Sequence, residues 1–138
     1  MDKLFVDTDI VLDLLTKREP HYSPAAELFS LADKKEIRLY VSPLSFANIN
    51  YILSKILSSD QSRKKLLKFK TLVTVLINDE KTIELALTSD FKDFEDGIQY
   101  YTAIEGGLKI LLTRNLKDYK SALISVMTAE QYLKSRKQ

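Results

Sequence analysis

Carboxylates gather at two places in this chain where apolar segments end, and their type and spacing could support metal chemistry. Asp7 and Asp9 follow the apolar run Leu4–Val6, Asp96 lies in an acidic stretch before a long apolar pattern, and Asp118 follows further on. Oxygen ligands without histidine or cysteine suit hard cations such as Mg²⁺ and Mn²⁺. Such a cation can generate a hydroxide nucleophile and polarise a phosphoryl oxygen. These residues therefore indicate a hard-cation site.

The same acids also have an ordinary structural explanation. Asp and Glu are favoured in the first turn of any helix, by capping and by the helix dipole. We expect Asp9 to cap a helix over residues 10–17 and Asp13 to lie on the solvated face of that helix. Helix-start preferences also account for Asp90, Asp93 and Glu95. Asp7 differs, because it lies before its helix, where a strand ends.

The composition excludes several classes of site. The 138-residue chain has no cysteine, which excludes disulfides, thiolate zinc sites and cysteine nucleophiles. The chain has a single histidine, which excludes a polyhistidine metal centre. This residue, His21, lies in a polar loop and is expected to be solvated. The net charge of +2 is too small to indicate nucleic-acid binding by itself. Without a membrane-span-length segment or a signal-peptide layout, we expect a cytoplasmic protein with no membrane association.

Apolar periodicity predicts the elements that must position these acids. Five strands are expected, at Leu4–Val6, Ile37–Val41, Leu72–Leu76, Lys109–Thr113 and Leu123–Val126. Helices are expected between them, with starts at Asp9, Ser23-Pro24, Ser42-Pro43, Asp60, Asn78-Asp79, Phe94 and Thr128, the last paired with Gln131. The helix that begins at Phe94 should end at Glu105, before the pair Gly106-Gly107.

Strands that alternate with helices favour a parallel sheet with helices on both faces. The chain contains no linker composition and no repeat, so we expect one domain over residues 1–138. Its fold class is α/β, a three-layer α/β/α sandwich with a central, mostly parallel sheet of four to five strands. Ligands of such sheets bind at the carboxyl ends of the strands. Asp7 and the segment Thr113–Asn115 should therefore meet at this edge.

The order of these features resembles the PIN domain, the fold of VapC-type toxins and related nucleases. Three stretches carry the resemblance: FVDTDIVLDLL, EDGIQYYTAIEGG and LLTRNLKDY. In the first, an Asp closes a strand before a helix; in the second, an acid opens a helix; in the third, a strand ends in a T-x-N turn. The resemblance extends from Asp7 to the last helix and implies a PIN-like fold for nearly the whole chain.

The resemblance also implies a site for one or two Mg²⁺ or Mn²⁺ ions that cleaves RNA with metal-activated water. Asp7 matches the first acid of the family and Asp96 the third. Asn48 and Asn115 stand where the family usually has its second and fourth acids, and Asp118 is expected to supply the missing charge. An amide oxygen can ligate a metal but brings no charge, so this departure predicts a weaker or differently arranged metal site.

Positive and aromatic residues supply candidate contacts to RNA. Arg114 lies beside the presumed site and is expected to clamp a phosphate, while Thr113 either contacts substrate or a metal-bound water, or is an ordinary strand residue. The run SRKKLLKFK is the densest positive segment, and its apolar residues should face inward with its lysines in solvent. Tyr51, Tyr100 and Tyr101 could stack on bases, although the last two lie in an apolar helix that should bury at least one of them.

The sequence thus favours a PIN-type, metal-dependent endoribonuclease that acts as the toxin of a toxin–antitoxin pair. Family analogy implies an RNA substrate, an antitoxin protein and a homodimer as partners. The alternative is a catalytically weak or inactive PIN-like module that binds RNA or protein, which the two amides favour. A phosphoacceptor receiver domain is disfavoured, because Leu76–Asn78 and Val126–Thr128 offer neither the Asp nor the Lys that this class needs.

Overall fold

Five short strands form one parallel sheet in the computed structural model, which describes residues 1–137. The strands are β1 (Lys3–Val6), β2 (Arg38–Val41), β3 (Thr74–Val75), β4 (Ile110–Leu112) and β5 (Ser125–Met127). Their order across the sheet is β3-β2-β1-β4-β5, and all four pairings are parallel. In the central strand, Phe5 pairs with Tyr40 on one side and Leu111 on the other. The predicted parallel sheet is therefore confirmed.

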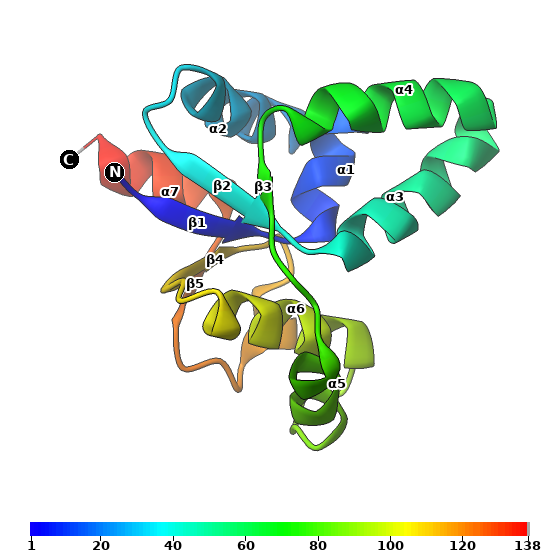
Figure 1. Ribbon diagram of the computed structural model, residues 1–138. Helices are drawn as coiled ribbons and strands as arrows, with labels where there is room; N and C mark the ends of the chain where they lie inside the picture. The colour runs from blue at the N-terminus through cyan, green and yellow to red at the C-terminus, as the bar shows by residue number, and fades with distance from the viewer. Residues whose placement is uncertain (138) are drawn as a thin grey trace.

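Alternation along the strands gives the sheet two buried faces. Leu4 and Val6 of β1 pack into one hydrophobic cluster, whereas Phe5, which points the other way, packs into a second. The first face is covered by α1 (Thr8–Thr16), α2 (Tyr22–Asp33), α3 (Pro43–Ile56), α4 (Ser59–Lys70) and α7 (Ala129–Arg136). The second is covered by α6 (Phe94–Glu105), with α5 (Glu80–Leu87) packed on it, and by the 3₁₀ turn η1 (Leu116–Tyr119). Figure 1 shows α5 and α6 on the opposite side of the sheet from α1–α4, as expected for a three-layer α/β/α sandwich.

Most helix boundaries follow the predicted local signals. α3 begins at Pro43 directly after Ser42, and α6 ends at Glu105 before Gly106. Gly107 has a positive φ of 75°, the conformation that lets a glycine terminate a helix. Thr128 and Gln131 exchange side-chain-to-backbone hydrogen bonds at the start of α7, so the predicted capping box is confirmed. None of the helices within residues 1–137 is long and apolar enough to cross a membrane.

Asp60 and Ser23, which the sequence indicated at helix starts, are each the second residue of their helix. α4 begins at Ser59, and Ser58 with Gln61 forms a reciprocal capping box that leaves Asp60 in the first turn. α2 begins at Tyr22, so Ser23 lies inside the helix, where its hydroxyl donates to Glu19.

Two details of packing and strand length also differ from the expectation. Leu67 of the basic run is 70% exposed and does not face inward, whereas Leu66 and Phe69 are buried as predicted. The third strand is only two residues long, at Thr74–Val75.

Candidate functional site

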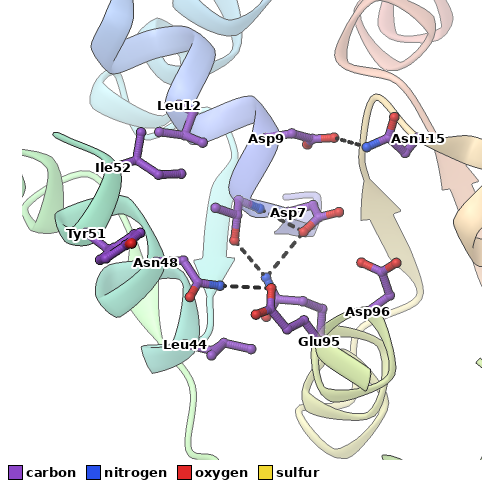
Figure 2. A pocket seen from close by; sticks show the side chains of 12 residues that line it. Asp7, Asp9, Leu12, Leu44, Asn48, Tyr51, Ile52, Glu95, Asp96 and Asn115 are labelled. Atoms are coloured by element: carbon purple, nitrogen blue, oxygen red, sulfur yellow. Dashed lines mark hydrogen bonds between the residues drawn. The ribbon is translucent and has the colours of Figure 1, made fainter. Parts of the chain in front are cut away.

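A pocket of about 410 Å³ opens at the carboxyl edge of the sheet, where β1 and β4 end. It is lined by residues of α1, α3 and α6 and of the turn after β4, namely Asp7, Thr8, Asp9, Leu12, Leu44, Asn48, Tyr51, Ile52, Glu95, Asp96, Gln99 and Asn115. Figure 2 shows the carboxylates on one side of this pocket and the apolar side chains of α1 and α3 on the other. The predicted meeting of the first and fourth strand ends is therefore confirmed.

Asp7 is a buried carboxylate that accepts hydrogen bonds from four different donors. Its Oδ1 accepts from the Thr8 backbone N–H at 2.8 Å and from Gln99 Nε2 at 3.3 Å. Its Oδ2 accepts from the hydroxyls of Thr113 at 2.9 Å and Tyr119 at 3.0 Å. Only 7% of Asp7 is exposed, so these donors replace the water that a carboxylate otherwise needs. Asp7 is also the N-cap residue of α1, the role that the sequence had suggested for Asp9.

Gln99 connects Asp7 to the start of α3 through a buried polar network. Its amide nitrogen also donates to the hydroxyls of Ser45 at 2.9 Å and Thr8 at 3.2 Å, while its oxygen accepts from Ser42. Gln99, Ser42 and Ser45 are all at most 2% exposed. A buried network whose members satisfy one another holds one geometry, so Gln99 fixes α6 relative to α1 and α3.

Asp9 binds the turn after β4 and does not cap the helix. Its Oδ2 accepts from the Arg114 backbone N–H at 3.1 Å, from Asn115 Nδ2 at 3.3 Å and from the Thr113 hydroxyl at 3.3 Å. Its Oδ1 is buried and finds no hydrogen-bond partner among residues 1–137. Burial and the adjacent charge of Asp7 raise the pKa of Asp9 from 3.8 to about 6.

Asp96 is a second acid whose pKa is raised by its surroundings. Burial raises its pKa first, and the negative charges of Asp7, Asp93, Asp118 and Asp9 then add to the effect, for a value of about 7. Like charges crowded into a poorly hydrated space disfavour their own ionised forms. A bound cation would relieve this repulsion.

Both amides at the site donate to a carboxylate from a neighbouring element. Asn48 of α3 donates from Nδ2 to Glu95 Oε2 of α6 at 3.2 Å. Asn115, after β4, donates from Nδ2 to Asp9 Oδ2 of α1. Each amide therefore stands beside an acid that lines the same pocket.

Three comparisons relate this fold and site to known proteins. The family model described as PIN domain matches residues 3–117. This chain belongs to the PIN domain family. It is 30% identical over 139 residues to the ribonuclease VapC1 of Aquifex aeolicus (strain VF5). The aligned region covers 95% of this chain and 93% of the relative. The protein is thus a homologue of a VapC ribonuclease.

Solved structures share the PIN fold. The crystal structure of VapBC2 from Rickettsia felis bound to a DNA fragment from their promoter matches with a TM-score of 0.67 and 20% identity, over 91% of this chain and 96% of that one. A toxin–antitoxin complex from Klebsiella pneumoniae matches with a TM-score of 0.66 and 23% identity, over 91% of this chain and 97% of that one.

Within this PIN domain, the predicted site residues fall into two groups. Asp7, Asp96, Asn48 and Asn115 line one pocket, as the sequence suggested. Asp118 is exposed on η1 and does not line that pocket, although its charge contributes to the raised pKa of Asp96. The sequence-based interpretation assigned Asp9 and Glu95 to helix starts, and it gave Gln99 and Tyr119 no role in the site.

Thr113 and Arg114 are placed differently from the substrate contacts that were expected. Thr113 is fully buried and its hydroxyl supports Asp7, so it lies beneath the surface that a substrate can reach. Arg114 Nε lies 2.7 Å from Oδ2 of Asp13. Asp13 is 1% exposed, which corrects the expectation that it lies on a solvated helix face. Nε of Arg114 therefore lies against a buried acid of α1, while the Arg114 side chain is 33% exposed. A phosphate contact by Arg114 stays a prediction.

The side chains of the pocket fit a divalent cation bound through oxygen. Carboxylates and amides are the donors that Mg²⁺ and Mn²⁺ prefer, and the unpartnered Oδ1 of Asp9 is a buried anionic atom without a compensating donor. Within residues 1–137, no three acidic side chains form a ready-made cage for a metal ion. Binding therefore requires side-chain rotation, for which Asp96 and Glu95 are exposed enough.

Replacing Arg114 should destabilise the fold because it leaves the Asp13 carboxylate buried and unpaired. We expect Arg114→Met to lower the free energy of unfolding by about 3 kcal/mol, the usual cost of removing one partner of a buried ion pair. Urea unfolding measures this loss. The double variant Asp13→Leu/Arg114→Met should recover most of the stability, because no charge remains buried. Unchanged stability in Arg114→Met, with weakened RNA binding, would instead favour the phosphate-clamp role.

Removing the charge of Asp96 should stabilise the metal-free protein at high pH. Because the pKa of Asp96 is raised from 3.8 to about 7, stability is greatest when this group is protonated and falls as pH rises from about 4 to about 7. Asp96→Asn should therefore raise Tm in EDTA at pH 8 more than at pH 5. After discounting for partial exposure we expect about 1 kcal/mol, or roughly 2–4 °C. Asp60→Asn, an exposed first-turn control, should not raise Tm at pH 8. An equal gain in both variants would contradict the repulsion.

Proposed function

We propose that this PIN domain is a metal-dependent endoribonuclease that hydrolyses phosphodiester bonds. The observation that carries the proposal is the set of four carboxylates that line one pocket, Asp7, Asp9, Glu95 and Asp96. The two amides that had suggested a depleted site each donate to one of these carboxylates. The acidic character of the pocket is thus retained although two expected acids are absent. The 30% identity to a ribonuclease over nearly the whole chain supports the same conclusion.

Asp7, Asp9 and Asp96 would hold Mg²⁺ or Mn²⁺, with the side-chain oxygen of Asn115 as an auxiliary ligand. When bound, the cation supplies Lewis acidity and an activated water for attack on phosphorus. The chain contributes position: four donors hold Asp7, and the turn after β4 holds Asp9. Such preorganisation lowers the reorganisation needed when charge develops at the phosphate.

Glu95 is the acid best placed to take part in proton transfer. It is exposed at the pocket wall, and the amide of Asn48 holds one of its oxygens. A carboxylate in this position can accept the proton of the attacking water while in-line displacement proceeds. Asn48 is then a positioning residue that acts through Glu95. In this proposal the carboxylate of Glu95 takes the place of the acid that the family usually has at position 48.

The relatives suggest a toxin that works with a partner protein. A structural relative was crystallised as a toxin–antitoxin complex, and the sequence relative is a VapC ribonuclease. We extend the partner to this chain as an antitoxin that restrains the nuclease. The homodimer stays a prediction from family analogy. A non-catalytic RNA-binding module remains the second candidate, because both oxygens of Asp7 are already hydrogen-bonded within the protein.

Asp7→Asn provides the direct test of the nuclease. It retains the size of the side chain but removes the charge, so we expect kcat/KM on a short single-stranded RNA to fall at least about 100-fold, or ~2.7 kcal/mol. Calorimetric titration with Mn²⁺ should show binding to the wild type and a loss of about tenfold or more in affinity for the variant. EDTA should abolish cleavage by the wild type. A wild type that neither binds millimolar Mn²⁺ nor cleaves RNA would leave the binding module as the better description.

Exchanging Asp9 and Asn115 tests whether the charge at this pair is what the metal requires. Asp9→Asn alone should weaken Mn²⁺ binding about tenfold, because it removes one carboxylate from the pocket. The double variant Asp9→Asn/Asn115→Asp restores one carboxylate and one amide. The charge is then at position 115, and the hydrogen-bond donor is at position 9. Its Mn²⁺ affinity should recover to within about threefold of the wild type. A double variant as weak as the single one would show that only the Asp9 position reaches the metal.

A further inference from the structure

We propose that the apolar half of the pocket is a nucleobase subsite in which Tyr51 stacks on an unpaired base of the substrate. The inference rests on the proposed function for the identity of the substrate, and it adds where that substrate is recognised. Nothing about the metal site requires this half of the pocket, since its residues carry no charge. The subsite comprises Leu12 of α1 and Leu44, Tyr51 and Ile52 of α3.

The subsite lies on one face of α3, directly beside the acidic wall. Leu44, Asn48, Tyr51, Ile52 and Lys55 recur at the three- and four-residue spacing that places side chains on one helix face. Figure 2 shows Tyr51 and Ile52 across the pocket from Asp7 and Asp96, with Asn48 between the two halves. A ligand that spans the pocket therefore meets an apolar surface at one end and the carboxylates at the other.

Tyr51 is not required by the core. It is 65% exposed, whereas Tyr100, Tyr119 and Tyr132 are each at most 4% exposed and pack into the two hydrophobic clusters. A large aromatic side chain left in solvent at the edge of a polar pocket is the arrangement that binds the face of another ring. Of the three tyrosines that the sequence offered for stacking, Tyr100 is buried and Tyr101 is half-buried against Phe91 and Tyr100. Tyr51 is the exposed one, and it alone of the three lines this pocket.

Lys55 places a positive charge against the same ring. Its Nζ lies 4.1 Å from the centroid of the Tyr51 ring, so it covers one face and leaves the other for a base. A base is attached to a phosphodiester, and an ammonium one helical turn from the stacking ring suits that anion. This pairing of an aromatic face with a cation favours a nucleotide over an apolar peptide. Because paired bases cannot present their faces, the substrate must be single-stranded or looped.

The absence of tryptophan from the chain makes the subsite directly measurable. Tyr51→Trp introduces a single tryptophan, whose emission a stacked base quenches. In EDTA, so that no cleavage occurs, we expect quenching by a short single-stranded RNA. A ribose-phosphate oligomer of equal length without bases should leave the emission unchanged. The matched control is Leu123→Trp; Leu123 is 92% exposed and lies before β5, at the opposite edge of the sheet, so this variant should not respond.

Kinetics of the full-length protein provide the second measurement. Tyr51→Leu should raise KM for single-stranded RNA about 5- to 100-fold with kcat nearly unchanged, the range expected for one lost base stack. Tyr51→Phe retains the ring and should stay within about twofold of the wild type. A merely structural role would instead lower Tm in Tyr51→Leu and affect KM and kcat together.

The outcomes separate this inference from the proposed nuclease. Quenching of the Tyr51→Trp variant by RNA, with no cleavage by the wild type, would support the subsite and reject the enzyme. Cleavage by the wild type without quenching, or equal quenching by the base-free oligomer, would overturn the subsite. If the emission of Tyr51→Trp changes with protein concentration alone, and gel filtration shows a dimer, this face belongs to self-association and the subsite is also overturned.

Discussion

The burial of the Asp7 carboxylate is the constraint on which the rest of this structure depends. A carboxylate that is 7% exposed is tolerated only if donors replace its hydration, and here they come from α1, α6, the end of β4 and η1. These segments are far apart in the sequence, so satisfying one charge brings both layers of helices to the same sheet edge. The buried network of Gln99 then extends this order to α3.

The same constraint explains why the pocket is acidic yet tolerates two amides. Burial, and then the negative charge of the fixed Asp7, raise the pKa of Asp9 to about 6 and that of Asp96 to about 7. Further carboxylates at positions 48 and 115 would add to this repulsion. An amide in each position instead donates to an acid already present, Glu95 or Asp9. The two amides therefore change where the negative charges lie around the pocket, but the pocket stays acidic.

Local patterns in the sequence were enough to predict the sheet, the α6 boundaries and the edge where Asp7 meets Asp96. Those features depend on periodicity and on short-range caps, which a single sequence contains. The prediction that Asp13 is solvated was wrong because its ion-pair partner, Arg114, is far away in the sequence. Asp7 and not Asp9 caps α1, for the same reason: only the folded turn after β4 shows that this turn binds Asp9. Tyr119 and Gln99 carry no local signal, because their function is a long-range hydrogen bond to Asp7.

The pocket thus divides its two tasks between different elements. Its charged side is built from α1 and α6 and is locked by buried hydrogen bonds, so a change there disturbs folding as well as chemistry. Its apolar side is one face of α3, and Tyr51 is exposed enough to change without disturbing the core. If the charged side performs hydrolysis and the apolar side selects the base, recognition can vary while the catalytic geometry is retained. Substitutions on the face of α3 that carries Leu44, Tyr51 and Lys55 would then change the RNA preference of this protein while leaving the acids in place.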